Sequence, residues 1–594
     1  MTAVLTLLSS PDSAVSDNAL KKLATFLGVS CVEAELEQFA EAPPAAGSAV
    51  VALSSQTLRQ GFVGGVTEAD ARDFFCRRAA KVLVYGFKAS PEDARLLQAL
   101  TDGAVSGVEP TQNSDRRYAF NPVLDRLEIP LAALSWETRE TRKASTFTEA
   151  AGGSTLIPLV SLNGKPLLAL WRTAGTEFFL LADSGIADID AWVAPSASVR
   201  DFYPTLLPPV VFLRTAFRQA CWSNPFRSAN FVIDDPLIRR RYGFLKYETL
   251  LSEARLNGYA VTLGFIPFNH ARSHCKVAGF LCGHLDRFSL AVHGCDHTGR
   301  EFGALDDALL VHKARLALER MCQHQELTSL PFDPVMVFPH GVYSTGALKA
   351  LKQTGYQAVV NTDATAHPVD CAQHPLALRH LLDGAITAYH SFPLFLRRYP
   401  AGVFDSAVDL LFGKPVLLVE HHGYFKAGYE PLASFVRNIN RLADGLAWVP
   451  LGRALTAHAL FRPLGPGRYA ARFFTPAFQL RNPAAIRASF LLEKSEMEGG
   501  VDHVAVNGRR VDFTVRSGVL ACEAELGPGE ACRVKVAYRE TPTTSCTLSL
   551  RYRGFAAARR YLSEIRDNYL ARNERLLSLA TRLKNVAQGA RCRP

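Results

Sequence analysis

The central part of the chain is constrained most strongly by a regular alternation of apolar runs and helix-like stretches. Seven runs are almost entirely apolar and have the length of strands: residues 231–233, 259–266, 288–292, 335–338, 357–360, 416–419 and 446–449. Most are separated by stretches with helical spacing of apolar residues, at 238–257, 304–323, 345–354 and 432–444. Because strands that are apolar on both faces belong to parallel sheets covered by helices, the pattern predicts a closed or nearly closed parallel barrel.

Polar side chains follow these runs, just past the ends of the predicted strands. They are Asp234, Asp235, Asn269, His270, His293, His297, His340, Asp363, His421 and His422. Fourteen of the sixteen histidines also fall between His270 and His422. The carboxyl ends of barrel strands converge on one face, so residues far apart in the sequence can share a pocket there. We therefore expect the chemistry of this protein in its central region.

Residues 1–195 have a different α/β pattern. Strand-like runs at 3–9, 48–53 and 81–87 alternate with helical patterns, and an Asn163-Gly164 turn joins two runs that predict an antiparallel hairpin. The pattern resembles Rossmann or amidotransferase-like α/β domains. Because the segment has neither a nucleophile-elbow sequence nor a phosphate-binding glycine loop, we expect an accessory domain without catalysis.

The rest of the chain divides into four further regions. Prolines mark residues 196–228 as a linker before the barrel at 229–455, and short alternating runs with turns such as Asn507-Gly508 predict a β-sandwich at 465–553. Residues 554–594 predict a helical tail, with apolar residues spaced mostly three and four apart. We expect this tail to pack on the body or against a second copy, so a homo-oligomer could form through it.

Composition argues against several classes of protein. The formal charge of +10 comes from Lys and Arg spread along 594 residues, which disfavours a nucleic-acid interface. Twelve cysteines include no Cys-x-x-Cys pair, so reduced thiols are expected rather than disulfides or a zinc ribbon. No run approaches the roughly 20 apolar residues that span a bilayer, and the N-terminus lacks the basic region of a signal peptide. The expectation is a soluble cytoplasmic protein without a membrane span.

Three of the polar residues form a candidate metal site. Asp235, His293 and His297 offer one carboxylate and two imidazoles, which bind divalent transition metals and leave coordination positions open. Such a metal lowers the pKa of a bound water from 15.7 toward about 7. Asp234, next to the ligand Asp235, is placed to accept the proton from that water.

These residues carry a resemblance to a known family. Ile233-Asp234-Asp235 and His293-Gly-Cys-Asp-His297 resemble the first two motifs of the polysaccharide deacetylase superfamily, which is carbohydrate esterase family four with the NodB-homology domain. The resemblance covers residues 230–451 and implies a deformed (β/α)7 barrel. It also implies that Asp234 is the general base and that Asp235, His293 and His297 hold the metal, usually zinc.

Later motifs of that family match this sequence less closely. Val337-Phe-Pro-His-Gly341 lies where the family has Arg-Pro-Pro-Tyr-Gly, so Val337 replaces the arginine that steadies the catalytic base. Glu420-His-His-Gly423 resembles the motif that supplies the general acid, a role open to His421 or His422. Asp363 is then the candidate to orient that histidine.

Some of these residues have simpler interpretations. An Asp-Asp pair before Pro236 is also typical of a helix N-cap. Asp296 and Glu301 could orient the metal-binding imidazoles or lie in a solvated loop, and Cys295 is expected to be a packing residue.

The joint pattern predicts a metal-dependent hydrolase that removes N-acetyl groups from an acetylated carbohydrate. Two alternatives remain open. A glycoside hydrolase would use Asp234 with another acidic residue at the ends of the strands. A carbohydrate-binding or assembly protein that has lost activity would be consistent with Val337 in place of the family arginine.

Overall fold

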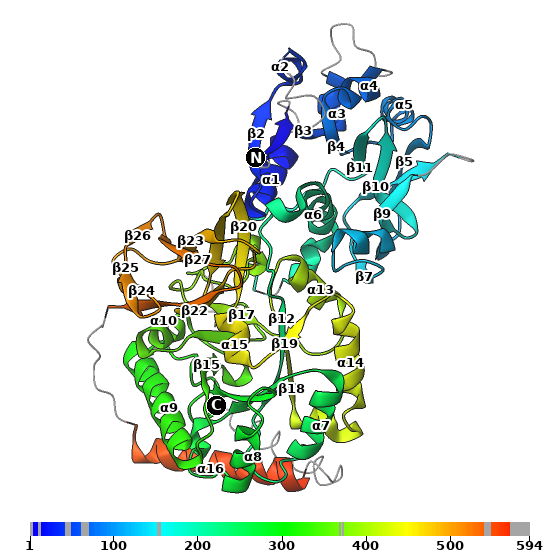
Figure 1. Ribbon diagram of the computed structural model, residues 1–594. Coiled ribbons are helices and arrows are strands. Elements are labelled where there is room, and N and C mark those ends of the chain that lie inside the picture. The colour runs from blue at the N-terminus through cyan, green and yellow to red at the C-terminus, as the bar shows by residue number, and fades with distance from the viewer. Residues whose placement is uncertain are drawn as a thin grey trace. The chain divides into compact units, whose positions relative to one another are not determined.

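The structure is a computed structural model that describes residues 4–9, 14–41, 49–60, 70–150, 156–195, 197–366, 370, 373–539 and 548–570. The chain forms two compact units (Figure 1). The first comprises Met1–Ser223, Ala377–Leu381 and Phe461–Ala470. The second comprises Asn224–Leu376, Leu382–Leu460 and Ala471–Pro594, and it contains all the predicted site residues.

The first unit is built on a sheet of nine strands in the order β2-β1-β3-β4-β11-β10-β9-β6-β7. The first five of these strands pair in parallel and the remaining pairs are antiparallel. The hairpin predicted at Asn163-Gly164 is present, and both residues have positive φ, at 50° and 83°. The strands are β1 (Val4–Leu8), β2 (Ser30–Ala34), β3 (Ala49–Ser54), β4 (Ala79–Tyr85), β6 (Asp115–Phe120), β7 (Ser135–Arg139), β9 (Ile157–Leu162), β10 (Lys165–Thr173) and β11 (Thr176–Leu181).

Helices and one two-stranded sheet complete this unit. The helices before residue 151 are α1 (Ala14–Phe26), α2 (Leu36–Glu41), α3 (Ser55–Gln60), α4 (Ala71–Cys76) and α5 (Pro91–Leu100). Strands β5 (Val105–Thr111) and β8 (Ala144–Glu149) pair with each other.

The segment predicted as a linker contains a buried helix, α6 (Tyr203–Phe217). Pro208 and Pro209 lie inside it, and the turn before it begins with a capping box formed by Ser198 and Asp201. The helix forms because twelve of its residues are buried, and this packing outweighs the two prolines.

The second unit contains a parallel sheet in the order β17-β16-β15-β14-β13-β12-β18. A bridge between Arg398 and Leu418 links β17 to β18, so the sheet is a nearly closed barrel, as predicted. Every residue of β12, β13, β14 and β16 is buried, which explains why these runs are apolar throughout. The strands are β12 (Ser228–Asp234), β13 (Val261–Phe265), β14 (Phe288–His293), β15 (Asp333–Val337), β16 (Ala358–Asn361), β17 (Leu394–Leu396) and β18 (Val416–His421).

One of the seven predicted strands is present only in part. The run at 446–449 contributes only β19 (Ala447–Trp448), which pairs with the start of β12 and ends before Pro450. The strand that completes the barrel is β17, which has only three residues. A strand this short has no readable periodicity, and the prolines on both sides, Pro393 and Pro400, further obscure it.

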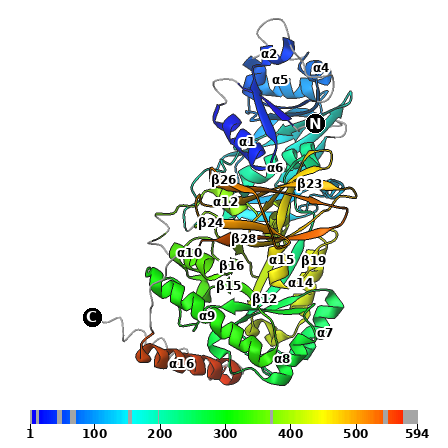
Figure 2. The same ribbon diagram turned by 60° about the vertical axis from the view of Figure 1, so that its left-hand side comes forward.

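Helices surround this sheet (Figures 1 and 2). Three of the four helices predicted in this region agree with the structure within a few residues, while the one predicted at 238–257 begins only at Tyr247. Among the described residues, the helices of this unit between β12 and the sheets that follow the barrel are α7 (Tyr247–Asn257), α8 (Cys275–Cys282), α9 (Asp307–Thr328), α10 (Thr345–Thr354), α13 (Phe404–Leu411), α14 (Glu430–Asn440) and α15 (Leu451–Thr456). Helix α12 (Leu378–Leu382) belongs largely to the first unit.

Two antiparallel sheets follow the barrel in the sequence. One has the order β22-β28-β24-β25, and the other ends in β23-β27-β26, with β20 and β21 extending it. The strands are β20 (Ala459–Gly465), β21 (Arg468–Phe473), β22 (Ala477–Arg481), β23 (Ala488–Ser495), β24 (Val501–Val506), β25 (Arg509–Val511), β26 (Phe513–Arg516), β27 (Val519–Leu526) and β28 (Ala531–Tyr538).

The described chain ends in helix α16 (Leu550–Ile565) and a π-helical turn, Arg566–Leu570. The helix begins four residues before the predicted tail, with Ser549 as its N-cap, and the tail beyond residue 570 lies outside the described residues. Among the described residues, no helix combines the length and apolarity needed to cross a bilayer.

Candidate metal centre

The three predicted ligands lie at the ends of β12 and β14, two barrel strands that are separated by β13. Asp235 comes directly after β12, with a left-handed backbone at φ 76°, and its N–H donates to Gly264 O on β13 at 3.1 Å. A Cβ at Gly264 would lie 2.8 Å from Asp234 Oδ1, so the close approach of these strand ends requires glycine. His293 ends β14, and His297 lies in the loop that follows, with φ 54°.

The side chains of Asp235, His293 and His297 converge on one point. Asp235 Oδ1 lies 3.3 Å from His293 Nε2 and 3.1 Å from His297 Nε2. One ligand atom from each residue lies within 4.8 Å of the others. The three residues that the sequence predicts as ligands therefore lie close enough together to hold a single ion.

The hydrogen bonding of these groups fits a cation. His293 Nδ1 lies 3.0 Å from Val337 O, which can only accept, so Nδ1 carries a proton and Nε2 is the ring nitrogen that faces Asp235. Asp235 Oδ1 is buried and has no hydrogen-bond partner among the described residues. Two imidazole nitrogens and a carboxylate oxygen that converge in a buried position can share a cation. Burial opposes ionisation of Asp235, but His297 and His293 nevertheless hold the pKa of its carboxyl well below the usual value.

Glu301 holds the loop that carries these ligands. Its Oε1 accepts from the backbone N–H groups of Cys295 at 2.8 Å and His297 at 3.1 Å. Its Oε2 accepts from Asp296 N at 3.1 Å. The Glu301 side chain is buried, so it is a positioning group and does not lie in a solvated loop. Cys295 is also buried, and burial raises the pKa of its thiol well above the usual value, which fits a packing role.

Asp234 lies beside the ligand group and is held by an arginine that sequence reasoning missed. Arg397 Nη1 donates to Asp234 Oδ1 at 2.8 Å and Nη2 donates to Oδ2 at 2.6 Å. Both side chains are 4% exposed, so this bidentate pair is shielded from solvent. Burial would raise the pKa of Asp234, but the charge of Arg397 outweighs it and the pKa is lowered. The signal that could have identified Arg397 is its position directly after the short apolar run Leu394-Phe-Leu396.

The two adjacent histidines after β18 have different surroundings. His421 is exposed and pairs in register with Asp234. His422 is buried, with Nε2 3.7 Å from Asp567 Oδ1 and its ring packed edge-on against Tyr242. The Nδ1 atom of His422 is buried without a hydrogen-bond partner among the described residues, under Gly243, where a Cβ would clash with it. His422 is therefore buried with its Nδ1 shielded from solvent, whereas His421 is exposed.

Two other predicted residues lie near this centre. The His340 ring lies 5.1 Å from the His297 ring, and burial lowers its pKa. Asp363 lies beside the Gly341 turn, where a Cβ on the glycine would come within 2.6 Å of Asp363 Oδ2. The carboxylate beside His422 is Asp567, from the C-terminal turn.

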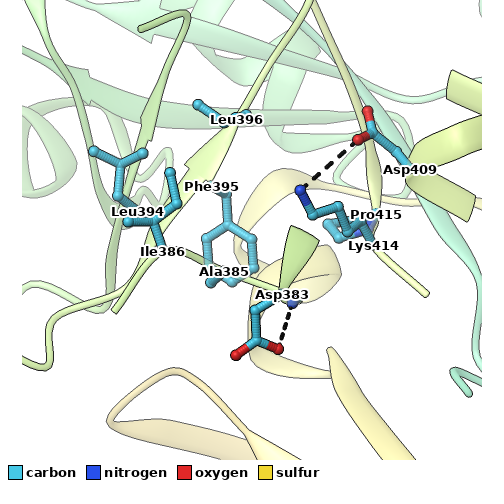
Figure 3. Close-up of a pocket in the computed structure, with 10 residues that line it drawn as sticks. Asp383, Ala385, Ile386, Leu394, Phe395, Leu396, Asp409, Lys414 and Pro415 are labelled. Carbon is cyan, nitrogen blue, oxygen red and sulfur yellow. Dashed lines mark hydrogen bonds and ion pairs between the residues drawn. The ribbon is translucent and has the colours of Figure 1, made fainter. Parts of the chain in front are cut away.

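A second group of buried charges lines a small cavity, shown in Figure 3. Its lining includes Asp383, Lys414 and Asp409, and none of its lining residues belongs to the metal centre. Lys414 Nζ lies 3.9 Å from Asp409 Oδ1, and burial lowers the pKa of Lys414. The cavity volume is about 10 Å³, which is room for about one water molecule. It cannot hold a substrate.

Comparison with known proteins gives matches to solved structures. The family 4 carbohydrate esterase from Streptomyces lividans matches 37% of this chain and 88% of its own, at 12% identity and a TM-score of 0.22. The carbohydrate esterase domain of a multidomain xylanase from the hindgut metagenome of Trinervitermes trinervoides matches 39% of this chain and 90% of its own, at 10% identity and 0.24. A peptidoglycan N-acetylglucosamine deacetylase matches 39% and 91%, at 10% identity and 0.24.

No protein-family model and no curated protein matches the sequence. The structural matches cover well under half of the chain.

Proposed function

We propose that the protein is a metal-dependent hydrolase that removes N-acetyl groups from an acetylated carbohydrate. The observation that carries the proposal is the position of Asp234 beside the converging ligand atoms of Asp235, His293 and His297. A fixed carboxylate next to a cation site is the arrangement needed to activate water for attack on an amide or ester carbonyl.

The chain supplies a complete ligand set and a base. Asp235, His293 and His297 would hold a divalent cation, for which zinc is the expected ion with one carboxylate and two imidazoles. Such a cation would polarise the acetyl carbonyl and lower the pKa of the attacking water. Asp234 accepts the proton from that water, and Arg397 keeps its carboxylate ionised and fixed in orientation despite burial.

His421 is the better candidate for the general acid. It is exposed and lies beside Asp234 in the strand register, so it can reach the leaving nitrogen of a bound acetamide. His422 is buried between Asp567 and Gly243, with its Nδ1 shielded from solvent. We therefore assign a structural role to His422.

Arg397 bears on the alternative of a binding protein without activity. The substitution of valine at position 337 is the sequence feature that favours this alternative. A guanidinium nevertheless reaches the base, because Arg397 comes from β17 and binds Asp234 bidentately. The backbone carbonyl of Val337 accepts from Gly294 N at 3.1 Å and lies 3.0 Å from His293 Nδ1. The contact between Arg397 and Asp234 supports the proposal of an active site.

Glycoside hydrolysis is less well supported. A glycosidase needs two carboxylates facing each other across the bond, one of them protonated or free to attack. Both oxygens of Asp234 are engaged with Arg397, and the pKa of Asp234 is lowered. Asp234 is therefore a poor proton donor, so a glycosidase would need a different residue as its acid.

Product analysis tests the proposal. Purified protein is incubated with a panel of acetylated oligosaccharides, with and without EDTA, and both acetate and new reducing ends are measured. We expect acetate release that EDTA abolishes and zinc restores, with no new reducing ends. Release of reducing ends without acetate, or acetate release that EDTA leaves unchanged, would overturn the proposal.

A further inference from the structure

The C-terminal residues 550–568, which we name the cover, contact the loops at the carboxyl ends of the barrel strands. The cover consists of α16 and the start of the turn after it. In Figures 1 and 2, α16 lies at one end of the second unit, beside α8 and α9. The contacts described below join it to the loops that follow β12, β13, β14, β15 and β18.

The first turn of α16 contacts the loop that carries the metal ligands. Tyr552 OH donates to Asp296 Oδ2 at 3.0 Å and lies 3.1 Å from Thr298 Oγ1. Lys313 Nζ lies over the Tyr552 ring, 5.0 Å from its centroid. Asp296 and Thr298 are immediate neighbours of the candidate ligand His297, so this end of the cover is tied directly to the ligand loop.

The middle of α16 is held by charged groups. Arg559 Nε donates to the carbonyl of His297 at 3.2 Å, and Arg559 Nη2 lies 3.5 Å from His340 Nε2. Glu564 forms an ion pair with Arg239 at 3.0 Å and a second one with Arg272. Glu564 thus joins the cover to the loops after β12 and β13.

The far end of the cover reaches the loop after β18. Asp567 accepts from Tyr242 OH at 2.8 Å and lies 3.7 Å from His422 Nε2. Asn568 Oδ1 accepts from Gly243 N at 2.9 Å. Asp567 therefore anchors the cover beside His422, which is buried while the cover is closed.

With the cover in place, the candidate site is almost closed. The exposed side-chain fractions are 4% for Asp234, 3% for His293, 10% for His297 and 15% for Asp235. These four side chains therefore offer little accessible surface to a residue within a polysaccharide chain. Movement of the cover would increase that surface.

The attachment of the cover is largely polar. Its inner face contributes the hydrogen bonds and ion pairs above and little apolar surface, with Ala556 the one buried hydrophobic residue among the described residues of α16. Its larger apolar residues face outward, where Phe555 is 54% exposed and Leu562 is 67% exposed. An element held by few apolar contacts and several ion pairs opens at low free energy and is weakened by salt.

We propose that residues 550–568 determine which substrates reach the site: closed, they restrict it to small acyl compounds, and released, they admit an acetylated sugar chain. The selection of substrate rests on the proposed function, whereas the shielding of the three ligands does not. The two parts therefore fail separately.

The test compares wild-type protein with the double variant Glu564→Gln, Asp567→Asn. Neither residue is a candidate ligand, base or acid. Glu525→Gln is the matched control, because Glu525 pairs with Arg487 at 3.3 Å on the β-sandwich and both side chains are mostly exposed. Three quantities are measured for each protein: hydrogen–deuterium exchange of the loops at 242–243 and 296–298, the rate at which EDTA removes zinc, and kcat/KM for an acetylated oligosaccharide relative to p-nitrophenyl acetate.

We expect the double variant to exchange faster in both loops and to lose zinc at least about tenfold faster, since each charge-assisted hydrogen bond lost favours the open state by roughly that factor. The oligosaccharide-to-ester ratio should rise, and sodium chloride should speed zinc loss in the wild type more than in the double variant. Unchanged hydrogen–deuterium exchange of both loops and an unchanged rate of zinc loss would overturn the proposal that residues 550–568 shield the site. Absence of acetate release by every protein, with faster zinc loss in the double variant, would overturn only the proposed reaction.

Discussion

Two buried polar groups in the second unit look alike in composition but differ in how they are satisfied. At the metal centre, Asp235 Oδ1 has no hydrogen-bond partner among the described residues. Around Glu496, in contrast, Oε2 lies 2.6 Å from Lys352 Nζ, and Oε1 accepts from Lys494 at 2.5 Å and Tyr538 at 2.6 Å.

This difference distinguishes a candidate ligand site, at Asp235, from a group of buried charges that supports the fold, around Glu496. Lys494 and Glu496 are fully buried, yet each carboxylate oxygen of Glu496 has a cationic partner. Such a group stabilises the fold and needs nothing from outside. The ligand atoms of Asp235, His293 and His297 lie within 4.8 Å of one another, which is the arrangement that a cation site needs. Perturbing the first group should change activity and metal binding, and perturbing the second should change only stability.

The largest effect on activity is expected from Asp234→Asn. The amide cannot accept a proton, so kcat should fall by about 10²–10⁴-fold. Bound zinc should remain at the wild-type level, because Asp234 is not one of the three converging ligands. Acetate release and elemental analysis on the same sample measure both. A variant with wild-type kcat would show that Asp234 is not the base.

Arg397→Met should lower activity through the state of Asp234. Without Arg397, burial is no longer opposed and the pKa of Asp234 rises from its lowered value. A protonated carboxyl cannot act as a base. As the pH falls, the variant should therefore lose activity at a higher pH than the wild type does, so the acid limb of its kcat/KM profile moves to higher pH. Arg398→Met is the matched control, because Arg398 pairs bidentately with Asp409 at 2.6 and 2.9 Å. Equal shifts of the acid limb in both variants would contradict the role of Arg397.

A smaller effect on metal binding is expected from Glu301→Gln. Loss of the carboxylate weakens the acceptance of three backbone N–H groups and loosens the ligand loop. Substitution of such a supporting group lowers metal affinity by about 10–100-fold. Competition with a chelator of known affinity measures the zinc affinity of the variant and of the wild type. Unchanged affinity would mean that the loop holds its conformation without Glu301.

Glu496→Gln should leave metal affinity unchanged and lower stability. Breaking a buried ion pair by removing one partner costs about 3–5 kcal/mol, because Lys494 stays buried without its anion. Denaturant unfolding and zinc titration on the same variant separate the two outcomes. A lower zinc affinity in this variant would contradict the claim that the group around Glu496 is separate in function from the candidate metal site.

The smallest effect is the pH dependence of stability that Lys494 contributes beside Glu496. Burial lowers the pKa of Lys494 to about 8 from 10.5. The folded state therefore binds fewer protons than the unfolded state between these values, so the contribution of Lys494 to stability rises with pH across that window. Lys494→Met should remove this rise. A stability curve with the same slope in both proteins would contradict it.

The sequence was sufficient for the barrel strands with long apolar runs and for the three converging groups. Asp235 and His293 are adjacent in space because each directly follows a strand that is buried on both faces, and the position of a strand end can be read from such a run. His297 follows in the same short motif. Local sequence therefore carried enough information to bring the three together.

What could not be predicted depends on contacts between distant parts of the chain. Arg397 and Asp234 are 163 residues apart and meet across the barrel after a strand of only three residues. Asp567 and Tyr242 are 325 residues apart. No short-range pattern encodes either pair, so the arginine at the base and the cover over the site became visible only in three dimensions.

The central claim is that Asp235, His293 and His297 hold one divalent cation. It is tested most directly by elemental analysis of the full chain after zinc loading and removal of free metal, for the wild type and for Asp235→Ala, His293→Ala and Glu496→Gln. The account predicts one zinc per chain in the wild type and in Glu496→Gln, and almost none in the other two. Stoichiometric zinc in folded Asp235→Ala and His293→Ala would contradict it.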